Sequence, residues 1–278
     1  MSISPSGDRI YGFTKFVAAL LGLVVFLAFI VLYFFPTRTK QLFAWPIQPP
    51  MTAMFIGASY ANGAIFFSAV LFEKKWHRVW APHIGVFFFA TMLLITTILH
   101  WDRFNHAHPV FWLWVFIYVL APVLVPWALI RNLPEDPNRP DAVDAQVPLA
   151  LRLTWFVPGL VLLAAAVYGF IKPAWLIPHW PWKATPLTMR VMMSFYCMVG
   201  VAVFTVLREP RWSAWRIGTI GVIVWHALII TAGFLRQGDF KNGLFYGWWF
   251  PFEAALLIAA VLTFAIMEFR AAKQEAIS

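Results

Sequence analysis

The chain has 278 residues, of which 62% are hydrophobic and 12% are charged, and its mean hydropathy is +0.74. This composition excludes an ordinary water-soluble domain, which would aggregate, and makes lipid the expected solvent. The net charge of +9 does not indicate nucleic-acid binding, because the Lys and Arg residues gather in short clusters between apolar stretches. The one cysteine, Cys197, lies in an apolar stretch and cannot form an intramolecular disulfide.

Eight apolar stretches are long enough to cross about 30 Å of hydrocarbon as helices. We therefore expect an all-α, polytopic membrane helix bundle of about eight transmembrane helices. The first stretch is too long for a secretory signal and ends without small residues, so we interpret it as a retained helix. In chain order the expected spans are residues 13–35, 51–72, 80–100, 109–130, 152–171, 186–207, 215–235 and 247–268.

The distribution of basic residues predicts the orientation in the membrane. Thirteen Lys and Arg residues fall on the side of the amino terminus, and seven, or eight with Arg190, fall on the other side. By the positive-inside rule both termini are expected in the cytoplasm, in a bacterial-type cytoplasmic (inner) membrane. Residues 136–150 are rich in prolines and acidic residues, which predicts a solvated cytoplasmic linker between units at 1–135 and 151–278.

The two units resemble each other. When the chain is aligned with itself, one constant shift pairs Tyr60 with Tyr196 and Trp76 with Trp212, and a shift shorter by one position pairs Trp45 with Trp180 in an earlier loop. We predict two tandem four-helix repeats, which an even number of spans would relate by a pseudo-two-fold axis along the membrane normal. We expect the tryptophans near span ends, including the Trp76/Trp212 pair, to anchor helices at the lipid headgroups.

Polar residues present in only one repeat are the candidates for a specific task, because an ionised group within a span costs at least ~2.5–3.5 kcal/mol. We predict that four of them line a polar cavity or ligand site, and each faces an apolar residue of the other repeat. Asn62 faces Met198, Arg190 faces Met54, His226 faces Ala90 and Glu253 faces Ile117.

Arg190 and Glu253 lie at similar depth near the outer ends of their helices. We expect them to form an ion pair or to share an outward-facing cavity. In the alternative, Arg190 extends to the headgroups and Glu253 hydrogen-bonds a neighbouring helix.

The loop after the third span contains three histidines and one aspartate within nine residues, which are ligand types for Zn²⁺ or Cu²⁺. Their spacing matches no metal signature, so we interpret the segment as a polar loop at the outer face. Its residues are His100, Asp102, Arg103, His106 and His108.

We predict no haem, because the histidines nearest the spans, His83, His100 and His226, lie at different depths. His226 is interpreted as a hydrogen-bonded core residue, with a quinone or carboxylate contact as the alternative.

The sequence lacks the His-Glu-x-x-His, Gly-x-Ser-x-Gly, P-loop and Gly-x-Gly-x-x-Gly motifs, so we predict no catalytic residue and a non-enzymatic protein. The preferred function is binding or translocation of a small or apolar molecule at the repeat interface. The alternative is an accessory or structural subunit that packs against partner membrane subunits, and a metal or haem redox protein ranks third. The shortage of acidic residues within the spans argues against ion-coupled transport.

Overall fold

The computed structural model describes residues 7–138 and 144–276, and within these ranges the chain is all-helical with no β-strand. Eight helices in the described ranges are long and apolar enough to cross a membrane. This confirms the predicted fold class. The eight helices are α1 (Gly12–Phe34), α3 (Pro50–Phe72), α4 (Pro82–Leu99), α5 (Pro109–Asn132), α6 (Leu149–Ile171), α8 (Pro186–Arg208), α9 (Trp212–Leu235) and α10 (Phe250–Glu275).

The helix boundaries follow the prolines in the sequence. Four of the long helices, α3, α4, α5 and α8, begin at a proline, where the missing backbone N–H would have had no partner within the helix. Short segments complete the connections: α2 (Thr39–Leu42), α7 (Pro173–Leu176) and single turns such as η2 (Trp76–Arg78). A π-helical turn, η7 (Phe245–Trp249), leads directly into α10.

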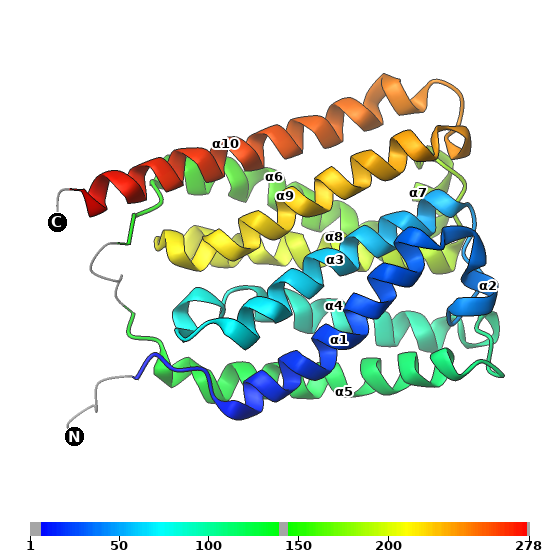
Figure 1. Cartoon of the computed structure of the whole chain (residues 1–278). Coiled ribbons are helices and arrows are strands. Elements are labelled where there is room, and N and C mark those ends of the chain that lie inside the picture. Colours follow the sequence, from blue (N-terminus) through cyan, green and yellow to red (C-terminus); the bar gives the residue numbers. More distant parts are fainter. Residues whose placement is uncertain (1–6, 139–143, 277–278) are drawn as a thin grey trace.

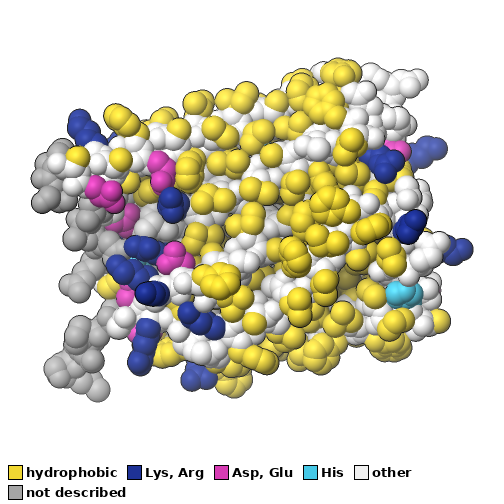
Figure 2. Space-filling model, in the orientation of Figure 1, with side chains coloured by type: hydrophobic (Ala, Val, Ile, Leu, Met, Phe, Trp, Pro, Cys, Tyr) yellow, Lys and Arg dark blue, Asp and Glu magenta, His cyan; other side chains and the backbone are white. Residues whose placement is uncertain are grey.

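The helices form a central group with a flank on each side, as the contacts between them and Figure 1 show. Helices α3, α4, α8 and α9 form the centre, where α3 packs on α9 and α4 packs on α8. On one flank α1 packs on α3 and α5 on α4, and on the other α6 packs on α8 and α10 on α9. Figure 2 shows apolar side chains along the length of the helices, with charged side chains gathered at the two ends. This distribution matches a bilayer around the middle of the bundle.

Contacts at the helix ends recur at corresponding places in the two halves. The backbone N–H of Trp76 donates to Asp8 O at 3.0 Å, and that of Trp212 donates to Ala145 O at 2.9 Å. The long basic side chains also correspond, because Lys15 Nζ bonds Leu71 O at 3.0 Å and Arg152 bonds Leu207 O at 2.8 Å. The duplication stays a prediction from the sequence, and these equivalent contacts support it.

The contacts correct the predicted register in the early loop. The Trp45 ring packs on Phe104 at 5.1 Å between centroids, and the Trp182 ring packs on Phe240 at 5.2 Å. Phe104 and Phe240 are related by the same shift as Tyr60 and Tyr196, so Trp45 corresponds to Trp182. Under the predicted duplication, these contacts favour Trp182 over Trp180 as the counterpart of Trp45, because a loop of tryptophans and prolines offers two similar alignments and only the packing distinguishes them.

The prediction that Trp76 and Trp212 anchor helix ends at the headgroups is also wrong. Both indoles are buried, with 0% and 3% of the residue exposed. Trp212 Nε1 donates to Glu268 at 2.8 Å, which fixes the start of α9 against α10.

The predicted linker is not solvated throughout. Residues 139–143 lie outside the described ranges, but Ala145 and Val147 are buried against the start of α9. Asp144 accepts hydrogen bonds from the backbone and hydroxyl of Ser213 at 3.0 and 2.5 Å.

Arg211 connects the linker to the second half through a buried ion network. Its guanidinium donates to both oxygens of Asp136 at 2.7 and 2.9 Å and to Glu209 at 2.7 and 2.5 Å. Glu209 also accepts from Trp80 Nε1 of the first half at 3.1 Å. The network therefore joins both halves at the end of the bundle that carries the termini.

The charges of this network are stabilised mutually. Burial would raise the pKa of Asp136, but the hydrogen bonds from Arg211 and from the Asn138 N–H outweigh it and lower the pKa. Burial likewise opposes the charge of Arg211, but the two carboxylates outweigh it and raise the pKa of Arg211.

We predict that acid weakens the fold through Asp136. A carboxyl group with a lowered native pKa stabilises the protein fully above its ordinary value of about 3.9, and this stabilisation is lost as the pH falls through the lower native value. Asp136→Asn should reduce the free energy of unfolding by about 1.5–3 kcal/mol at neutral pH and flatten its fall below about pH 4. Chemical unfolding in detergent at several pH values measures both effects. Asp102→Asn, at an exposed carboxylate of the other end, should change neither, and equal effects of the two substitutions would contradict the prediction.

Candidate functional site

A histidine and a glutamate form a hydrogen-bonded pair inside two membrane-length helices. His226 of α9 and Glu253 of α10 approach through Nδ1 and Oε2 at 2.6 Å. Both residues are buried, with 5% and 1% exposed. The pair forms because α10 packs along α9 and places the first turn of α10 beside the middle of α9.

The pair brings an acidic and a basic side chain into direct contact inside the bundle. A buried polar side chain without a partner is unfavourable in a low-dielectric interior, and here each residue is the hydrogen-bond partner of the other.

An aromatic cluster connects this pair to the interface between the halves. Trp225 precedes His226 and lies with its ring centroid 5.2 Å from the imidazole. It also packs on Tyr196 of α8 at 5.7 Å and on Phe55 of α3 at 6.2 Å. Phe55 belongs to the first half, so the ionisable pair lies one residue from the contact between halves.

Trp180 packs on the same two side chains. Its ring centroid lies 6.5 Å from Phe55 and 6.3 Å from Tyr196. The indole N–H groups of Trp180 and Trp225 are both buried, and neither has a hydrogen-bond acceptor among the described residues. A buried donor without an acceptor costs about 1–3 kcal/mol, so two donors around one pair of rings form an unsatisfied polar feature in an apolar cluster.

In the first half, the contact between α4 and α5 is the counterpart of the contact between α9 and α10, and among the described residues it contains no pair of an acidic and a basic side chain like His226 and Glu253. Trp114 of α5 donates to Thr97 at 2.8 Å, and Trp249 lies against Gly233, the residue that the main repeat shift pairs with Thr97. Under the predicted duplication, this correspondence favours Tyr118 over Ile117 as the counterpart of Glu253.

Tyr118 hydrogen-bonds Tyr60 between hydroxyls at 2.7 Å. Under the predicted duplication, the first half therefore makes this helix contact with the hydroxyl groups of two tyrosines, where the second half has an acidic and a basic side chain.

The predicted pairing of Arg190 with Glu253 is wrong. Arg190 instead donates from Nε to Phe170 O at 3.1 Å and contacts His100 Nε2 at 2.7 Å. Helix depth alone suggested the pairing, but α8 turns Arg190 towards α4 and α6, whereas α10 lies along α9. Glu253 hydrogen-bonds a neighbouring helix, as the alternative interpretation expected.

Asn62 lies at the contact between α3 and α9. A Cβ atom added to Gly221 would lie 2.1 Å from Asn62 Oδ1, so the amide occupies space that only glycine leaves open. Asn62 and His226 both contribute to the interface between halves, but no hydrogen bond joins Asn62 to the His226–Glu253 pair in the described residues.

The polar loop at the other end uses its histidines to fix backbone. His106 contacts Trp101 O through Nε2 at 2.9 Å. His108 contacts Gln41 O through Nε2 at 2.8 Å, and its Nδ1 accepts from the backbone N–H of Val110 at 3.2 Å, which caps α5. Asp102 and Arg103 are exposed, and the described residues contain no group of three or more His, Cys, Asp or Glu able to hold a metal ion.

His100 accepts a hydrogen bond from Arg190. Burial first, and then the positive charges of Arg190 and Arg103, lower the pKa of His100. The imidazole is therefore neutral near pH 7 and can accept through Nε2. Because His100 follows α4 and Arg190 lies on α8, this contact joins the two halves at the end of the bundle opposite the termini.

The residues predicted from the sequence include His226 and Glu253 but not Trp180, Trp225, Tyr196 and Phe55, which pack beside them in the structure. Trp225 was the available signal, because it lies in the middle of a span rather than near an end, where a headgroup anchor belongs. No protein-family model matches the chain, and no curated protein or solved structure is significantly similar to it. The function must therefore be argued from the site itself.

We predict that His226→Ala alone destabilises the protein more than the double substitution His226→Ala with Glu253→Tyr. The single substitution leaves a buried carboxyl group without its partner, at a cost of about 2.5–3.5 kcal/mol. The double substitution installs the residues of the first half, Ala90 and Tyr118, and gives Tyr196 a phenol to contact. Thermal unfolding in detergent measures the difference. A double variant no more stable than the single one would contradict the internal comparison.

Proposed function

We propose that this integral membrane protein binds a small apolar molecule bearing hydrogen-bond acceptors at the interface between its two halves. The main support for this proposal is that the indole N–H groups of Trp180 and Trp225 are buried without an acceptor among the described residues. The two indole rings also pack on the same neighbours, Phe55 and Tyr196. Binding sites for small molecules are mostly apolar and aromatic, with a few polar groups that fix the orientation of the ligand. The cluster has this composition.

Two further buried indoles, Trp45 and Trp76, also lack an acceptor among the described residues. Trp180 and Trp225 differ from them in packing on the same two side chains beside an ionisable pair. Acceptor atoms of a ligand, such as carbonyl oxygens, would satisfy both donors and remove their desolvation cost. The aromatic rings would cover the apolar body of the ligand.

The His226–Glu253 pair adds a hydrogen-bonded polar contact beside the proposed site. Trp225 lies against the imidazole of His226, so a ligand bound at Trp225 would also lie close to this pair. Translocation would follow if the two halves rock against each other, as in transporters built from parallel repeats.

The test uses native mass spectrometry of the protein isolated from its own membrane in mild detergent. We predict that the wild-type protein carries a small-molecule adduct. The affinity calculated from its occupancy should fall roughly tenfold or more in the double variant Trp180→Phe with Trp225→Phe, because two hydrogen bonds are lost while aromatic rings remain. Trp112→Phe, at an exposed indole of α5, is the matched control and should keep the adduct. Bare protein in every sample, or the same adduct on all three, would contradict the proposal.

We also propose that both termini lie in the cytoplasm of a bacterial-type inner membrane, on the basis of the excess of basic residues at that end. We predict that a fluorescent protein that matures only in the cytoplasm becomes fluorescent when fused after Ser278. An alkaline phosphatase fused at the same place should be inactive, because it requires the oxidising side. Active phosphatase with a dark fluorescent fusion would reverse the orientation.

A further inference from the structure

We infer that Arg190, His100 and Arg103 form a binding site for a phosphate group at the end of the bundle opposite the termini. Arg190 lies in the second turn of α8, His100 directly follows α4, and Arg103 ends the turn η3 (Trp101–Arg103). The site shares no residue with the proposed ligand site, so the two can be tested separately. The phosphate group could belong to a phospholipid headgroup or to the free ion, and the experiment distinguishes these sources.

The contact between Arg190 and His100 leaves hydrogen-bond donors on both side chains. The guanidinium donates from Nε to Phe170 O at 3.1 Å and from Nη1 to His100 Nε2 at 2.7 Å, which uses only part of its N–H groups. Since arginine has no acceptor atom, His100 must accept through Nε2, and the neutral imidazole then carries its proton on Nδ1. No described residue accepts a hydrogen bond from this Nδ1.

The charges around this contact are positive. Arg103 is exposed and lies close enough to His100 for its charge to act on the imidazole. Asp102 precedes Arg103, but it is not among the charges that act on His100 or on Arg190. Among the described residues no carboxylate forms an ion pair with Arg190. A cation partly withdrawn from water without an anion is unfavourable, so the site favours an anionic ligand.

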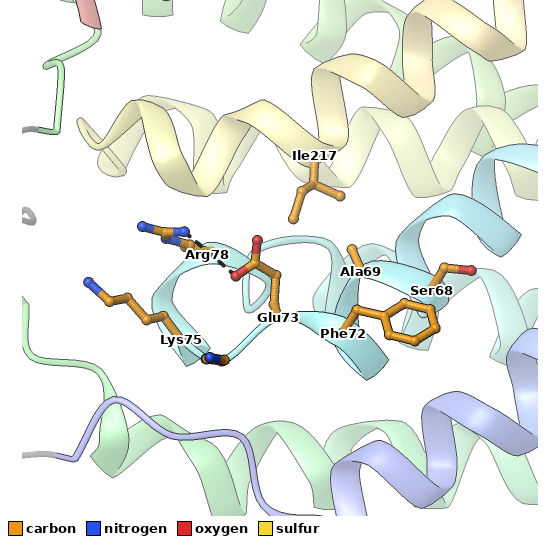
Figure 3. Close-up of a pocket in the computed structure, with 8 residues that line it drawn as sticks. Ser68, Ala69, Phe72, Glu73, Lys75, Arg78 and Ile217 are labelled. Atoms are coloured by element: carbon orange, nitrogen blue, oxygen red, sulfur yellow. Dashed lines mark ion pairs between the residues drawn. The ribbon is translucent and has the colours of Figure 1, made fainter.

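A groove at the opposite end of the bundle shows how an arginine is held when a carboxylate is present. Figure 3 shows Arg78 paired with Glu73 in this groove, beside the end of α3, with 3.6 Å between Nη1 and Oε2. Arg190 contacts a histidine where Arg78 has a carboxylate, and a neutral histidine contributes no negative charge. An anion from outside the chain would supply it.

Under the predicted duplication, the corresponding end of the other half contains a carboxylate of its own. Asp239 corresponds to Arg103, and its side chain accepts from the backbone N–H of Met51, at the start of α3, at 2.8 Å. Met54 corresponds to Arg190. Basic residues also occur around that end of the other half: Arg38, Lys40, Arg236 and Lys241. The site is therefore distinguished by a change from an acidic and an apolar side chain to two arginines, and not by the presence of a cation alone.

The residue types and the position of the site favour a phosphate group. A guanidinium donates through a planar fork that matches the oxygens of phosphate, and a membrane surface offers phosphate groups at this depth. The neighbouring helices end in exposed apolar residues, since Leu99 of α4 is 57% exposed and Ile171 of α6 is 60% exposed. Acyl chains can lie against such residues while the phosphate binds the arginines, so we expect a phospholipid to bind more tightly than the free ion.

The experiment measures binding of single lipids to the purified full-length protein by native mass spectrometry. Phosphatidylglycerol should bind more tightly than diacylglycerol, which has the same acyl chains but no phosphate. Arg190→Met introduces the residue type of Met54 and should weaken phosphatidylglycerol binding roughly tenfold or more, with diacylglycerol binding unchanged. The matched control, Arg38→Gln, removes an exposed cation at the same end of the bundle and should change neither affinity.

Inorganic phosphate identifies the source of the phosphate group. If it protects the protein against thermal unfolding more than phosphatidylglycerol does, and Arg190→Met abolishes this protection, the site stands with the free ion as its ligand. Equal affinity for the two lipids, without protection by inorganic phosphate, would overturn the inference. Equal weakening of phosphatidylglycerol binding by Arg190→Met and Arg38→Gln would overturn it too.

A second variant decides if circular dichroism shows that Arg190→Met does not fold. Arg103→Gln changes an exposed side chain and should weaken phosphatidylglycerol binding by roughly fivefold. An unchanged affinity in this variant would reject the site.

Discussion

The structure depends on the absence of water from the hydrocarbon, where every polar group needs a partner within the protein. Helices satisfy the backbone, so the eight spans are helical throughout. Hydroxyl groups within the spans follow the same requirement: Ser59 donates to Phe55 O at 2.9 Å, and Thr97 donates to Leu93 O at 2.8 Å. Against this background, a buried polar side chain that lacks a partner is costly and indicates a specific task.

Comparison of the two similar halves distinguishes contacts that build the helix bundle from side chains that are present in one half only. Where both halves use the same contact, as Lys15 and Arg152 do on the helix ends, the contact belongs to the frame. Where they differ, one half shows that the frame is stable without the feature. Tyr60 and Tyr118 close the first half with neutral hydroxyls, so His226 and Glu253 need an explanation other than folding.

The spans were predictable and the side-chain partners were not. Length and hydropathy fix the spans to within a few residues, because the thickness of the bilayer sets the length of each helix. They also fix the depth of a side chain, but not the direction in which it leaves its helix. Arg190 and Glu253 share a depth, and the packing of α10 on α9 directs Glu253 to His226 instead. Tryptophan was misinterpreted for the same reason, since Trp76 lies near a helix end but faces inward.

The Arg211 network and the His226–Glu253 pair differ in the segments that they connect. Arg211, Asp136 and Glu209 lie at the ends of helices, close to water, and their hydrogen bonds tie the linker to α9 and to Trp80. Joining these segments accounts for the whole cluster. The His226–Glu253 pair joins only α9 and α10, which already pack along their length. That packing does not in itself require a buried acid beside a base, since the corresponding contact in the first half joins the hydroxyl groups of Tyr60 and Tyr118.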